Sequence, residues 1–329
     1  MPESPAKTEF IVGVDLGGTK ILSGLFTPAL KSLGKVKLST KAERGPDAVL
    51  DRIARCVRDV VDECDLDLKN CKGIGIGAPG AVDFDNGRVI FAPNLGWKDV
   101  PVKKELEKRL DVPVFLENDC NVCTLGVHER ELGGKPRHLI GIFIGTGIGG
   151  GIILDGKLFS GANHTAGEIG HMVLQVDGEK CACGNKGCFE ALASRTAIFN
   201  RIQAAVKDGQ KTLLTEMLGD KFENLKSGDL RKAIRRGDKF VEEAIEEAAE
   251  YIGIAVGNLV NLFNPEIVVL GGGVIDALED EMFKIITRTA LTYAMPGSDK
   301  DLKIIPTKLG NDAGITGAAV LAQKQLKRS

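Results

Sequence analysis

The sequence predicts an α/β protein built from two related halves. A buried-strand pattern at residues 10–14 leads into a glycine-rich turn at residues 15–20 and a second apolar run at residues 21–26. The same order of strand, glycine turn and strand recurs at residues 139–154. Such a repeat indicates two related halves, which we expect to face each other across a cleft. A chain of 329 residues is long enough for two such domains.

The composition indicates a cytoplasmic enzyme with no membrane or nucleic-acid partner. The formal net charge is −2 and there is no basic tract, which argues against a binding surface for nucleic acid or anionic lipid. No apolar run in the sequence is long enough to cross a bilayer. Five cysteines are scattered as expected where thiols stay reduced: Cys56, Cys64, Cys71, Cys120 and Cys123.

The two glycine-rich turns are candidate phosphate sites. A tight turn between strands presents backbone N–H groups and small side chains that suit a phosphate. Each turn alone is a weak signal, because hairpins need glycine for structural reasons. The match between the two turns, with an acidic residue and a threonine in the first, strengthens the functional interpretation. The candidate nucleotide-binding residues are Asp15, Gly17, Gly18, Thr19, Lys20, Gly145, Thr146, Gly147 and Gly149.

A third glycine cluster, Gly271, Gly272 and Gly273, follows an apolar strand pattern at residues 266–270. Glycines at the carboxyl end of a strand let a flat ring approach the backbone, at the edge where open α/β sheets bind ligands. Adenine is the candidate ligand for this cluster.

The pair Asn118-Asp119 follows a strand pattern at residues 112–116, and a helix is expected over residues 120–131. An aspartate in this place is commonly only a helix cap, and we expect Asp119 at or near the N-cap. The alternative is chemical. The Asn118 amide would fix a hydroxyl group, and the Asp119 carboxylate would accept its proton as a general base. The residues alone leave both interpretations open.

Further loops and helices surround these motifs. Residues 78–80 form a turn at the end of a strand pattern, and Asn94 lies in a loop that Trp97, the only tryptophan, is expected to anchor by packing. Residues 208–239 predict a pair of surface helices, and residues 240–262 predict a packing helix.

Three cysteines and a histidine have the spacing of a metal site. They form a complete tetrahedral ligand set for Zn²⁺: His171, Cys181, Cys183 and Cys188. Four protein ligands leave no position for water or substrate, so such an ion would be structural. The alternatives are a disulfide and unliganded buried or redox-active cysteines. Glu168 and Glu190 flank the motif as candidate ligands of a polar substrate.

Several motifs together resemble the ROK family (repressors, open reading frames, kinases). In order, they are Asp15-Leu-Gly-Gly-Thr-Lys20, Leu116-Glu-Asn-Asp119, the Gly-Thr-Gly-Ile-Gly-Gly-Gly run at residues 145–151, Glu168-Ile-Gly-His171 and Cys181-x-Cys183-Gly-x-x-Gly-Cys188-x-Glu190. The similarity extends from about residue 9 to residue 321. Within the family the chain looks most like the bacterial-type glucokinases, because residues 93–101 are similar to their sugar-side loop.

The resemblance implies an actin-like, ribonuclease H-type fold with two α/β domains that close on ATP and a sugar. The expected domains are residues 1–118 plus 312–329, the smaller, and residues 119–311, the larger, with the zinc-binding loop. The implied cofactors are ATP, Mg²⁺ and a structural Zn²⁺.

The resemblance also implies roles for individual residues. Asp119 would be the general base on the sugar 6-hydroxyl, and Asp15 would organise Mg²⁺ through water. His171 would place one ring nitrogen on zinc and turn the other toward the sugar. The residues implied to contact the sugar are Gly80, Asn94, Asn118, Asp119, Glu168, His171 and Glu190. The implied activity is phosphorylation of glucose in glycolysis.

Several alternatives stay open within this resemblance. The acceptor could be fructose, mannose, N-acetylglucosamine or N-acetylmannosamine, and the donor could be ADP or polyphosphate. A non-catalytic sugar sensor is a further alternative. A repressor of this family needs a DNA-binding segment ahead of the first strand, where fewer than ten residues stand, so we expect none. A homodimer or a dimer of dimers is expected from the family and from the frequency of symmetric oligomers.

Overall fold

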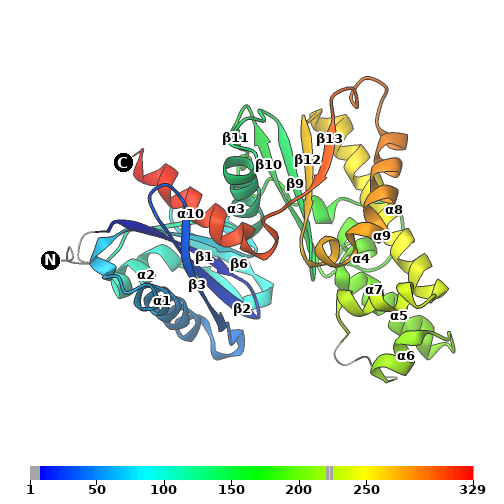
Figure 1. The fold of residues 1–329 in the computed structure, drawn as a ribbon, viewed down its shortest axis with the longest axis horizontal. Coiled ribbons are helices and arrows are strands. Elements are labelled where there is room, and N and C mark those ends of the chain that lie inside the picture. The colour runs from blue at the N-terminus through cyan, green and yellow to red at the C-terminus, as the bar shows by residue number, and fades with distance from the viewer. Residues whose placement is uncertain (1–7, 220–221, 223–224, 329) are drawn as a thin grey trace. The chain divides into compact units, whose positions relative to one another are not determined.

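The computed structural model describes residues 8–219, 222 and 225–328 (Figure 1). The chain divides into two compact units. Unit 1 comprises Met1–Arg137, Gly151–Gly167 and Asn311–Ser329, and unit 2 comprises His138–Gly150 and Glu168–Gly310. The domain boundaries expected from the sequence, 1–118 plus 312–329 and 119–311, stay a prediction.

The predicted α/β class is confirmed, with mixed sheets and covering helices. The first sheet has the strand order β3-β2-β1-β4-β8. In it β1 pairs antiparallel with β2 and parallel with β4, which is parallel to β8. Its strands are β1 (Phe10–Leu16), β2 (Lys20–Phe26), β3 (Ser32–Ser39), β4 (Cys71–Ala78) and β8 (Val114–Asn118). A small antiparallel sheet consists of β5 (Ala81–Asp83), β6 (Arg88–Ala92) and β7 (Trp97–Val100).

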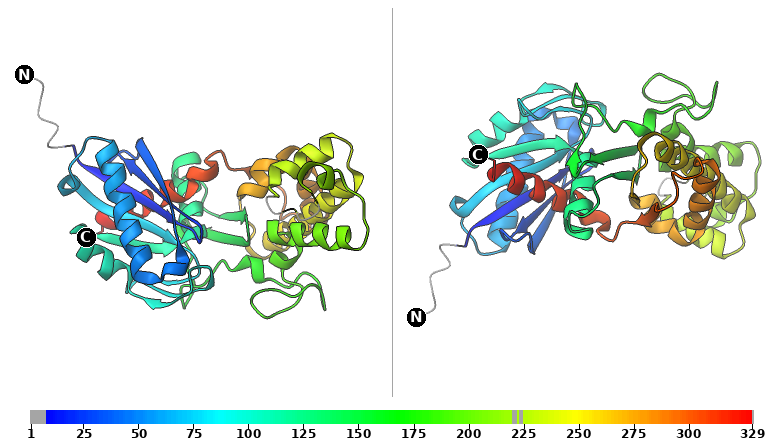
Figure 2. Two further views of the ribbon diagram at one scale, coloured as in Figure 1. Left: turned by 90° about the horizontal axis from the view of Figure 1, so that it is seen from below. Right: turned by 90° about the horizontal axis from the view of Figure 1, so that it is seen from above.

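Helices cover both faces of the first sheet (Figure 2). On one face lie α1 (Pro46–Glu63) and α2 (Val102–Leu110). On the other lie α3 (Asp119–Gly126) and α10 (Ala313–Leu326). Two strand glycines let α10 approach the sheet closely, because a Cβ on Gly13 or Gly75 would overlap the carbonyl oxygens of Ile315 and Ala318. This packing brings the start of α10 against the end of β1.

The second sheet has the strand order β11-β10-β9-β12-β13, with β12 parallel to both β9 and β13. Its strands are β9 (Leu139–Ile144), β10 (Ile148–Leu154), β11 (Lys157–Leu158), β12 (Ile267–Gly271) and β13 (Lys303–Pro306). The helices of unit 2 are α4 (Phe189–Ala193), α5 (Arg195–Lys207), α6 (Leu213–Leu218), α7 (Ser227–Arg235), α8 (Lys239–Phe263) and α9 (Gly273–Tyr293). Apolar residues of these helices and of β9 and β12 form one core.

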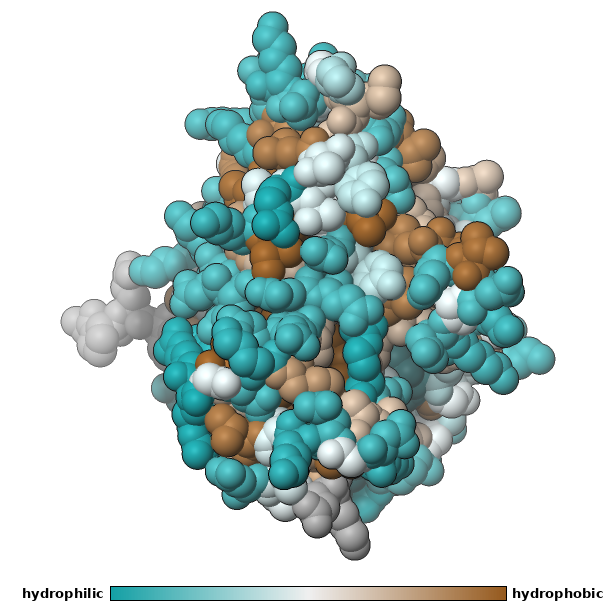
Figure 3. Space-filling model, turned by 90° about the vertical axis from the view of Figure 1, so that its right-hand side faces the viewer, coloured by the Kyte–Doolittle hydropathy of each residue, from teal (hydrophilic) through white to brown (hydrophobic). Residues whose placement is uncertain are grey.

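Helices α6 and α7 match the predicted pair of surface helices, and α8 matches the predicted packing helix. Short 3-10 turns complete the chain at Ala42–Arg44, Leu68–Asn70, Pro93–Leu95, Ile169–His171 and Gly310–Asp312. None of the helices in the described ranges is long and apolar enough to cross a membrane. Figure 3 shows mostly hydrophilic side chains on one face, with apolar side chains scattered among them.

Two local predictions are corrected. The helix expected over residues 120–131 begins at Asp119, and its N-cap is Asn118, whose side chain accepts hydrogen bonds from the first turn. The α-helix ends at Gly126, and Val127–Glu131 continues as a π-helix. The second glycine turn is also shorter than the glycine run suggests. Strand β10 starts at Ile148, so the turn itself consists of residues 145–147 and Gly149 lies in the strand.

Candidate active site

The turn between β8 and α3 is held by the side chain of Asn118. Its Oδ1 accepts hydrogen bonds from the backbone N–H groups of Cys120 (2.9 Å) and Asn121 (3.1 Å), and its Nδ2 donates to the carbonyl oxygen of Gly80 (3.1 Å). Asn118 and Gly80, two predicted sugar ligands, are therefore hydrogen-bonded to each other. One carboxylate oxygen of Asp119 accepts the N–H of Cys120 (2.8 Å). These contacts fix the backbone that carries Asp119.

The buried side chain of Glu117 also stabilises this turn, and no role was predicted for Glu117 from the sequence. Its side chain is 3% exposed. Its Oε1 accepts hydrogen bonds from the backbone N–H of Asn118 (2.8 Å) and from Nδ2 of Asn121 (3.1 Å). Burial raises the pKa of the Glu117 carboxyl, whereas these donors and the nearby His164 act in the opposite direction.

Asp15 lies in β1, against the first turn of α10. A Cβ on Gly314 would lie 2.8 Å from Cγ of Asp15. Burial raises the pKa of the Asp15 carboxyl, and the Lys20 ammonium opposes this shift. A cation bound beside this carboxylate would favour its charged form.

Cys123 shows that Asp15 and Asp119 lie in one electrostatic neighbourhood of unit 1. Burial raises the pKa of the Cys123 thiol well above its ordinary value, and the charges of Asp15 and Asp119 raise it further. The backbone geometry agrees, because Asp15 is paired with Gly77 of β4, and a Cβ on Gly77 would lie 3.4 Å from Cα of Asp119. The candidate metal-organising residue and the candidate base are thereby brought together.

The first glycine turn lies beside Asn94. The turn is closed by a hydrogen bond from the N–H of Gly17 to the carbonyl oxygen of Lys20 (2.9 Å), and the Thr40 hydroxyl donates to the Gly17 carbonyl (2.6 Å). A side chain on Gly18 would contact the carbonyl oxygen of Asn94 at 3.2 Å. The predicted sugar-side loop and the predicted phosphate turn are therefore neighbours within unit 1.

Trp97 anchors that loop as predicted. Its side chain is 1% exposed and belongs to the core of unit 1. Its indole Nε1 is buried without a hydrogen-bond partner among the residues described.

The second glycine turn, in unit 2, is fixed by helices α4 and α5. Its ends are joined by the N–H of Gly145 donating to the carbonyl oxygen of Gly147 (2.8 Å). Glu190 of α4 accepts the N–H of Ile148 through Oε2 (2.8 Å). The close approach of Glu190 requires glycine at position 147, since a Cβ there would overlap Oε2. One oxygen of this predicted sugar ligand is therefore committed to the turn.

Arg195 and Thr196, at the start of α5, contact the same turn, and neither was predicted from the sequence. The guanidinium of Arg195 donates to the Thr146 hydroxyl (2.5 Å), and its backbone N–H donates to the Gly145 carbonyl (3.0 Å). The Thr196 hydroxyl donates to the Thr146 carbonyl (2.7 Å). No motif marked these residues, because their partners stand about fifty positions earlier in the chain.

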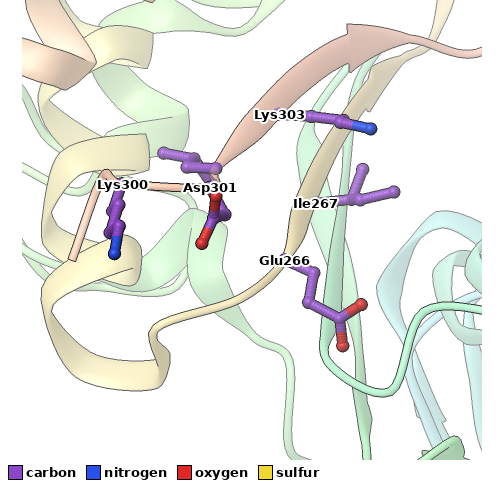
Figure 4. A pocket seen from close by; sticks show the side chains of 6 residues that line it. Glu266, Ile267, Lys300, Asp301 and Lys303 are labelled. Carbon is purple, nitrogen blue, oxygen red and sulfur yellow. The ribbon is translucent and has the colours of Figure 1, made fainter.

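The third glycine cluster lies where it was predicted, at the carboxyl end of β12. Gly271 is the last residue of the strand, Gly272 is the N-cap of α9, and Gly273 is its first residue. Figure 4 shows a pocket near the opposite, amino end of β12 and β13, lined by Glu266, Ile267, Lys300, Asp301, Leu302 and Lys303. It contains no predicted site residue, and its side chains carry both signs of charge.

The four predicted metal ligands converge in unit 2. One ligand atom from each of His171, Cys181, Cys183 and Cys188 lies within 4.8 Å of the others. Nδ1 of His171 is 3.7 Å from Sγ of Cys181, and the sulfur atoms of Cys183 and Cys188 are also 3.7 Å apart. Thiolates on a tetrahedral zinc with bonds of about 2.3 Å are separated by about 3.8 Å. The donor set and its spacing therefore fit a zinc ion.

Protonation of the thiols adds a condition for metal binding. Burial raises the pKa of Cys188 to about 12, while the backbone N–H of Asn185 lowers the pKa of Cys183. Metal ligation needs thiolates, so metal uptake would release protons. The second ring nitrogen of His171, Nε2, lies 4.0 Å from Oε2 of Glu168. His171 thus has one nitrogen toward the cysteines and the other toward a predicted sugar ligand.

Another group of possible ligands in unit 1 consists of Asp83, Asp85 and His164. Nε2 of His164 lies 3.4 Å from Asp85. Both carboxylate oxygens of Asp83 already accept hydrogen bonds from Asn86, so this residue has a structural role in the turn. We assign no function to this group.

The predicted site residues are distributed over both units. Unit 1 holds Asp15, Gly17, Gly18, Thr19, Lys20, Gly80, Asn94, Asn118 and Asp119. Unit 2 holds Gly145, Thr146, Gly147, Gly149, Glu168, His171, Cys181, Cys183, Cys188, Glu190, Gly271, Gly272 and Gly273.

Comparison with known proteins finds relatives along nearly the whole chain. A glucokinase of Thermotoga maritima is 36% identical over 317 residues, which cover 96% of this chain and 98% of the relative. An N-acetyl-D-glucosamine kinase of Vibrio cholerae is 32% identical and covers 94% of this chain and 98% of the relative.

A solved structure gives the same fold. The ROK family glucokinase of Streptomyces griseus, in complex with glucose and AMPPNP, matches with a TM-score of 0.84 and 31% identity, over 96% of this chain and 99% of that one. The actin-like fold expected from the resemblance is thereby confirmed. The ROK family model matches residues 11–325. The chain therefore belongs to the ROK family.

Proposed function

We propose that this chain is an ATP-dependent glucokinase that transfers the γ-phosphoryl group of ATP to the 6-hydroxyl of glucose. The observation that carries the proposal is Asp119, a carboxylate on the first residue of α3, directly after β8, on a turn held by Asn118 and Gly80. The names of full-length relatives and the glucose and AMPPNP complex of the Streptomyces griseus enzyme support this choice of substrates.

Asp119 is the proposed general base. In phosphoryl transfer the protein need not form a covalent bond to the substrate. It must align the acceptor hydroxyl with the γ-phosphorus and stabilise the charge that develops. Asp119 would accept the proton of the 6-hydroxyl as the oxygen attacks. Its carboxylate is oriented by the N–H of Cys120, and its backbone by Asn118. A base fixed in this way loses little freedom on the path to the transition state.

The two glycine turns are the proposed phosphate sites. Backbone N–H groups, the Thr19 hydroxyl and the Thr146 hydroxyl would hold phosphate oxygens, and Gly271, Gly272 and Gly273 would lie beside the adenine ring. Mg²⁺ bound with the nucleotide would screen phosphate charge. Burial disfavours the charged form of Asp15 and so raises its pKa, and Mg²⁺ bound nearby would favour the charged form.

Hydroxyl groups of the sugar are the proposed partners of Asn94, Asn118, Glu168, His171 and Glu190, with backbone contact from Gly80. Oδ1 of Asn118 already accepts two hydrogen bonds from the first turn of α3, and one N–H of its Nδ2 donates to Gly80. The second N–H of Nδ2 is therefore the group available to the sugar. Glu190 likewise keeps one oxygen for a hydroxyl group, because Ile148 occupies the other.

A structural zinc ion would be held by His171, Cys181, Cys183 and Cys188. It would stabilise the segments that carry Glu168 and Glu190. Cys188 is the N-cap residue of α4, which contains Glu190, and His171 lies three residues after Glu168. The ion would take no part in phosphoryl transfer.

A kinase of N-acetylglucosamine is the second candidate, supported by the Vibrio cholerae relative. A panel of hexoses and amino sugars with ATP and Mg²⁺, followed by ADP release, tests both. Turnover selective for glucose is the expected result. Preference for an N-acetylated sugar would transfer the assignment to the second candidate, and binding without turnover would contradict the kinase. The cytoplasmic location and the homodimer stay predictions.

A further inference from the structure

The second glycine turn has a cation at its edge that the proposed mechanism does not yet use. Arg195 lies at the first position of α5, and its guanidinium donates a hydrogen bond to the Thr146 hydroxyl. Within the described ranges, Arg195 forms no ion pair with a carboxylate. A guanidinium has five N–H donors, and this contact uses one of them.

The contact also determines what the Thr146 hydroxyl can do. A threonine hydroxyl has one donor and two acceptor sites. Because its oxygen accepts from Arg195, the hydroxyl proton is directed to another acceptor. The Thr146 carbonyl oxygen is already occupied by the Thr196 hydroxyl. Thr146 is exposed, so its hydroxyl proton is available to water or to a ligand oxygen that binds at the turn.

We propose that Arg195 binds the phosphate groups of the nucleotide, directly through its guanidinium and indirectly by orienting the Thr146 hydroxyl. The inference rests on the proposed function, which places the phosphates at this turn. A planar guanidinium matches the oxygens of a phosphate better than an ammonium does, and charge-assisted hydrogen bonds are about twice as strong as neutral ones. Arg195 would thus supply positive charge where the turn itself offers only neutral donors, its backbone N–H groups and the Thr146 hydroxyl.

The test is a calorimetric titration of the full chain with AMPPNP and Mg²⁺ in the absence of sugar, alongside steady-state kinetics with glucose and ATP. Arg195→Ala is expected to weaken nucleotide binding by about tenfold or more, with the KM for glucose within about twofold of the parent value. Arg195→Lys should recover part of the loss, because it restores charge without the planar fork.

Two matched variants separate ligand binding from support of the turn. Arg201→Ala removes an arginine of the same helix that pairs with Glu247 over 2.9 Å, and it should bind AMPPNP like the parent. Thr196→Val removes the other side-chain contact to the turn and keeps the cation, and it should cost less than about threefold. If Thr196→Val loses as much affinity as Arg195→Ala, the arginine is only structural and the proposal is wrong.

The orientation of Thr146 is tested by a double-variant cycle. Thr146→Val combined with Arg195→Ala should lose less affinity than the product of the two single losses, because the two residues act together. Independent effects would refute the orienting role. A parent that phosphorylates glucose while Arg195→Ala binds AMPPNP normally would overturn this inference alone. A parent that binds no nucleotide would overturn the proposed function and this inference with it.

Discussion

The buried carboxylate of Glu117 accepts a hydrogen bond from the side-chain amide of Asn121 over 3.1 Å. The same oxygen accepts the backbone N–H of Asn118 over 2.8 Å. Strand β8 and helix α3 are thereby joined on the buried side of the turn, and the Asn118 cap joins them on the other. These hydrogen bonds on both sides of the turn fix the position of Asp119.

Replacing the proposed base should abolish most turnover with little loss of binding. We expect Asp119→Asn to lower kcat by about 10²–10⁴-fold, because a positioned general base contributes about that much. The KM values for glucose and ATP should change far less. Steady-state kinetics measure both, with Asp111→Asn as the control, since Asp111 is an exposed residue that ends α2. A kcat near that of the parent would remove Asp119 from the mechanism.

Breaking the Glu117 network should destabilise unit 1. Glu117→Leu leaves the Asn118 N–H and the Asn121 amide without their acceptor, and we expect a loss of about 1–3 kcal/mol for each buried group left unpaired. Glu117→Gln keeps an oxygen of the same shape and should cost less. Urea unfolding, with the parent as reference, measures the difference. Equal losses for Leu and Gln would show that the hydrogen bonds to Glu117 do not matter.

The difference in stability between the parent and Glu117→Gln should depend on pH, with a definite sign. Burial raises the pKa of Glu117 in the folded protein, so the folded state holds this proton more tightly than the unfolded state. Its favourable contribution is complete below the unfolded pKa and is lost as the pH rises through the folded pKa. Glutamine does not titrate. The stability of the parent relative to Glu117→Gln should therefore fall as the pH rises, and a rise would contradict the direction of the shift.

Removing a zinc ligand should lower both stability and sugar affinity. Cys183→Ser should reduce the zinc content of the purified protein and its Tm, because binding of a structural metal contributes to the free energy of folding. The affinity for the sugar should also fall, because Glu168 and Glu190 would no longer be held in place by the metal site. Cys64→Ser, outside the ligand set, is the matched control and should leave the zinc content unchanged. A parent free of metal, with Tm and sugar affinity unaffected by Cys183→Ser, would reject the bracing role.

The close packing of α10 on the first sheet predicts a severe glycine substitution. A Cβ on Gly75 would overlap the carbonyl oxygen of Ala318, so Gly75→Ala should destabilise by about 3 kcal/mol. Gly228→Ala is the opposite case, because a Cβ at that position in α7 meets nothing within 4 Å. It should stabilise the protein by about 0.5–1 kcal/mol. Denaturant unfolding of both variants checks the contrast, and equal effects would contradict it.

The sequence predicted the features that local patterns encode. The strands around both glycine turns form at the apolar runs and are largely buried, as expected. The four metal ligands stand close enough along the chain to be recognised by spacing. Asp119 lies next to the N-cap, as expected. The exact cap could not be predicted, because Asn118 and Asp119 are both good caps and only the extended backbone of Asn118 decides between them.

Arg195 and Glu117 show what the sequence could not provide. An arginine that opens a helix is ordinarily a solvated surface residue, and only folding brings it to Thr146. Glu117 stands inside a recognised motif, but its burial and its bond to Asn121 depend on how β8 and α3 pack. The signal that could have pointed to it is a carboxylate placed directly before the candidate base.

The position of α10 has a consequence for biosynthesis. Its residues Ile315 and Ala319 share an apolar cluster with Ile11 and Leu22 of the first two strands. In the order of translation, all of unit 2 lies between these partners. The nascent chain must therefore carry a sheet face that only α3 can cover while the whole of unit 2 is made. During that interval the apolar residues that α10 later covers are exposed, and exposed apolar surface of this kind favours aggregation with other chains.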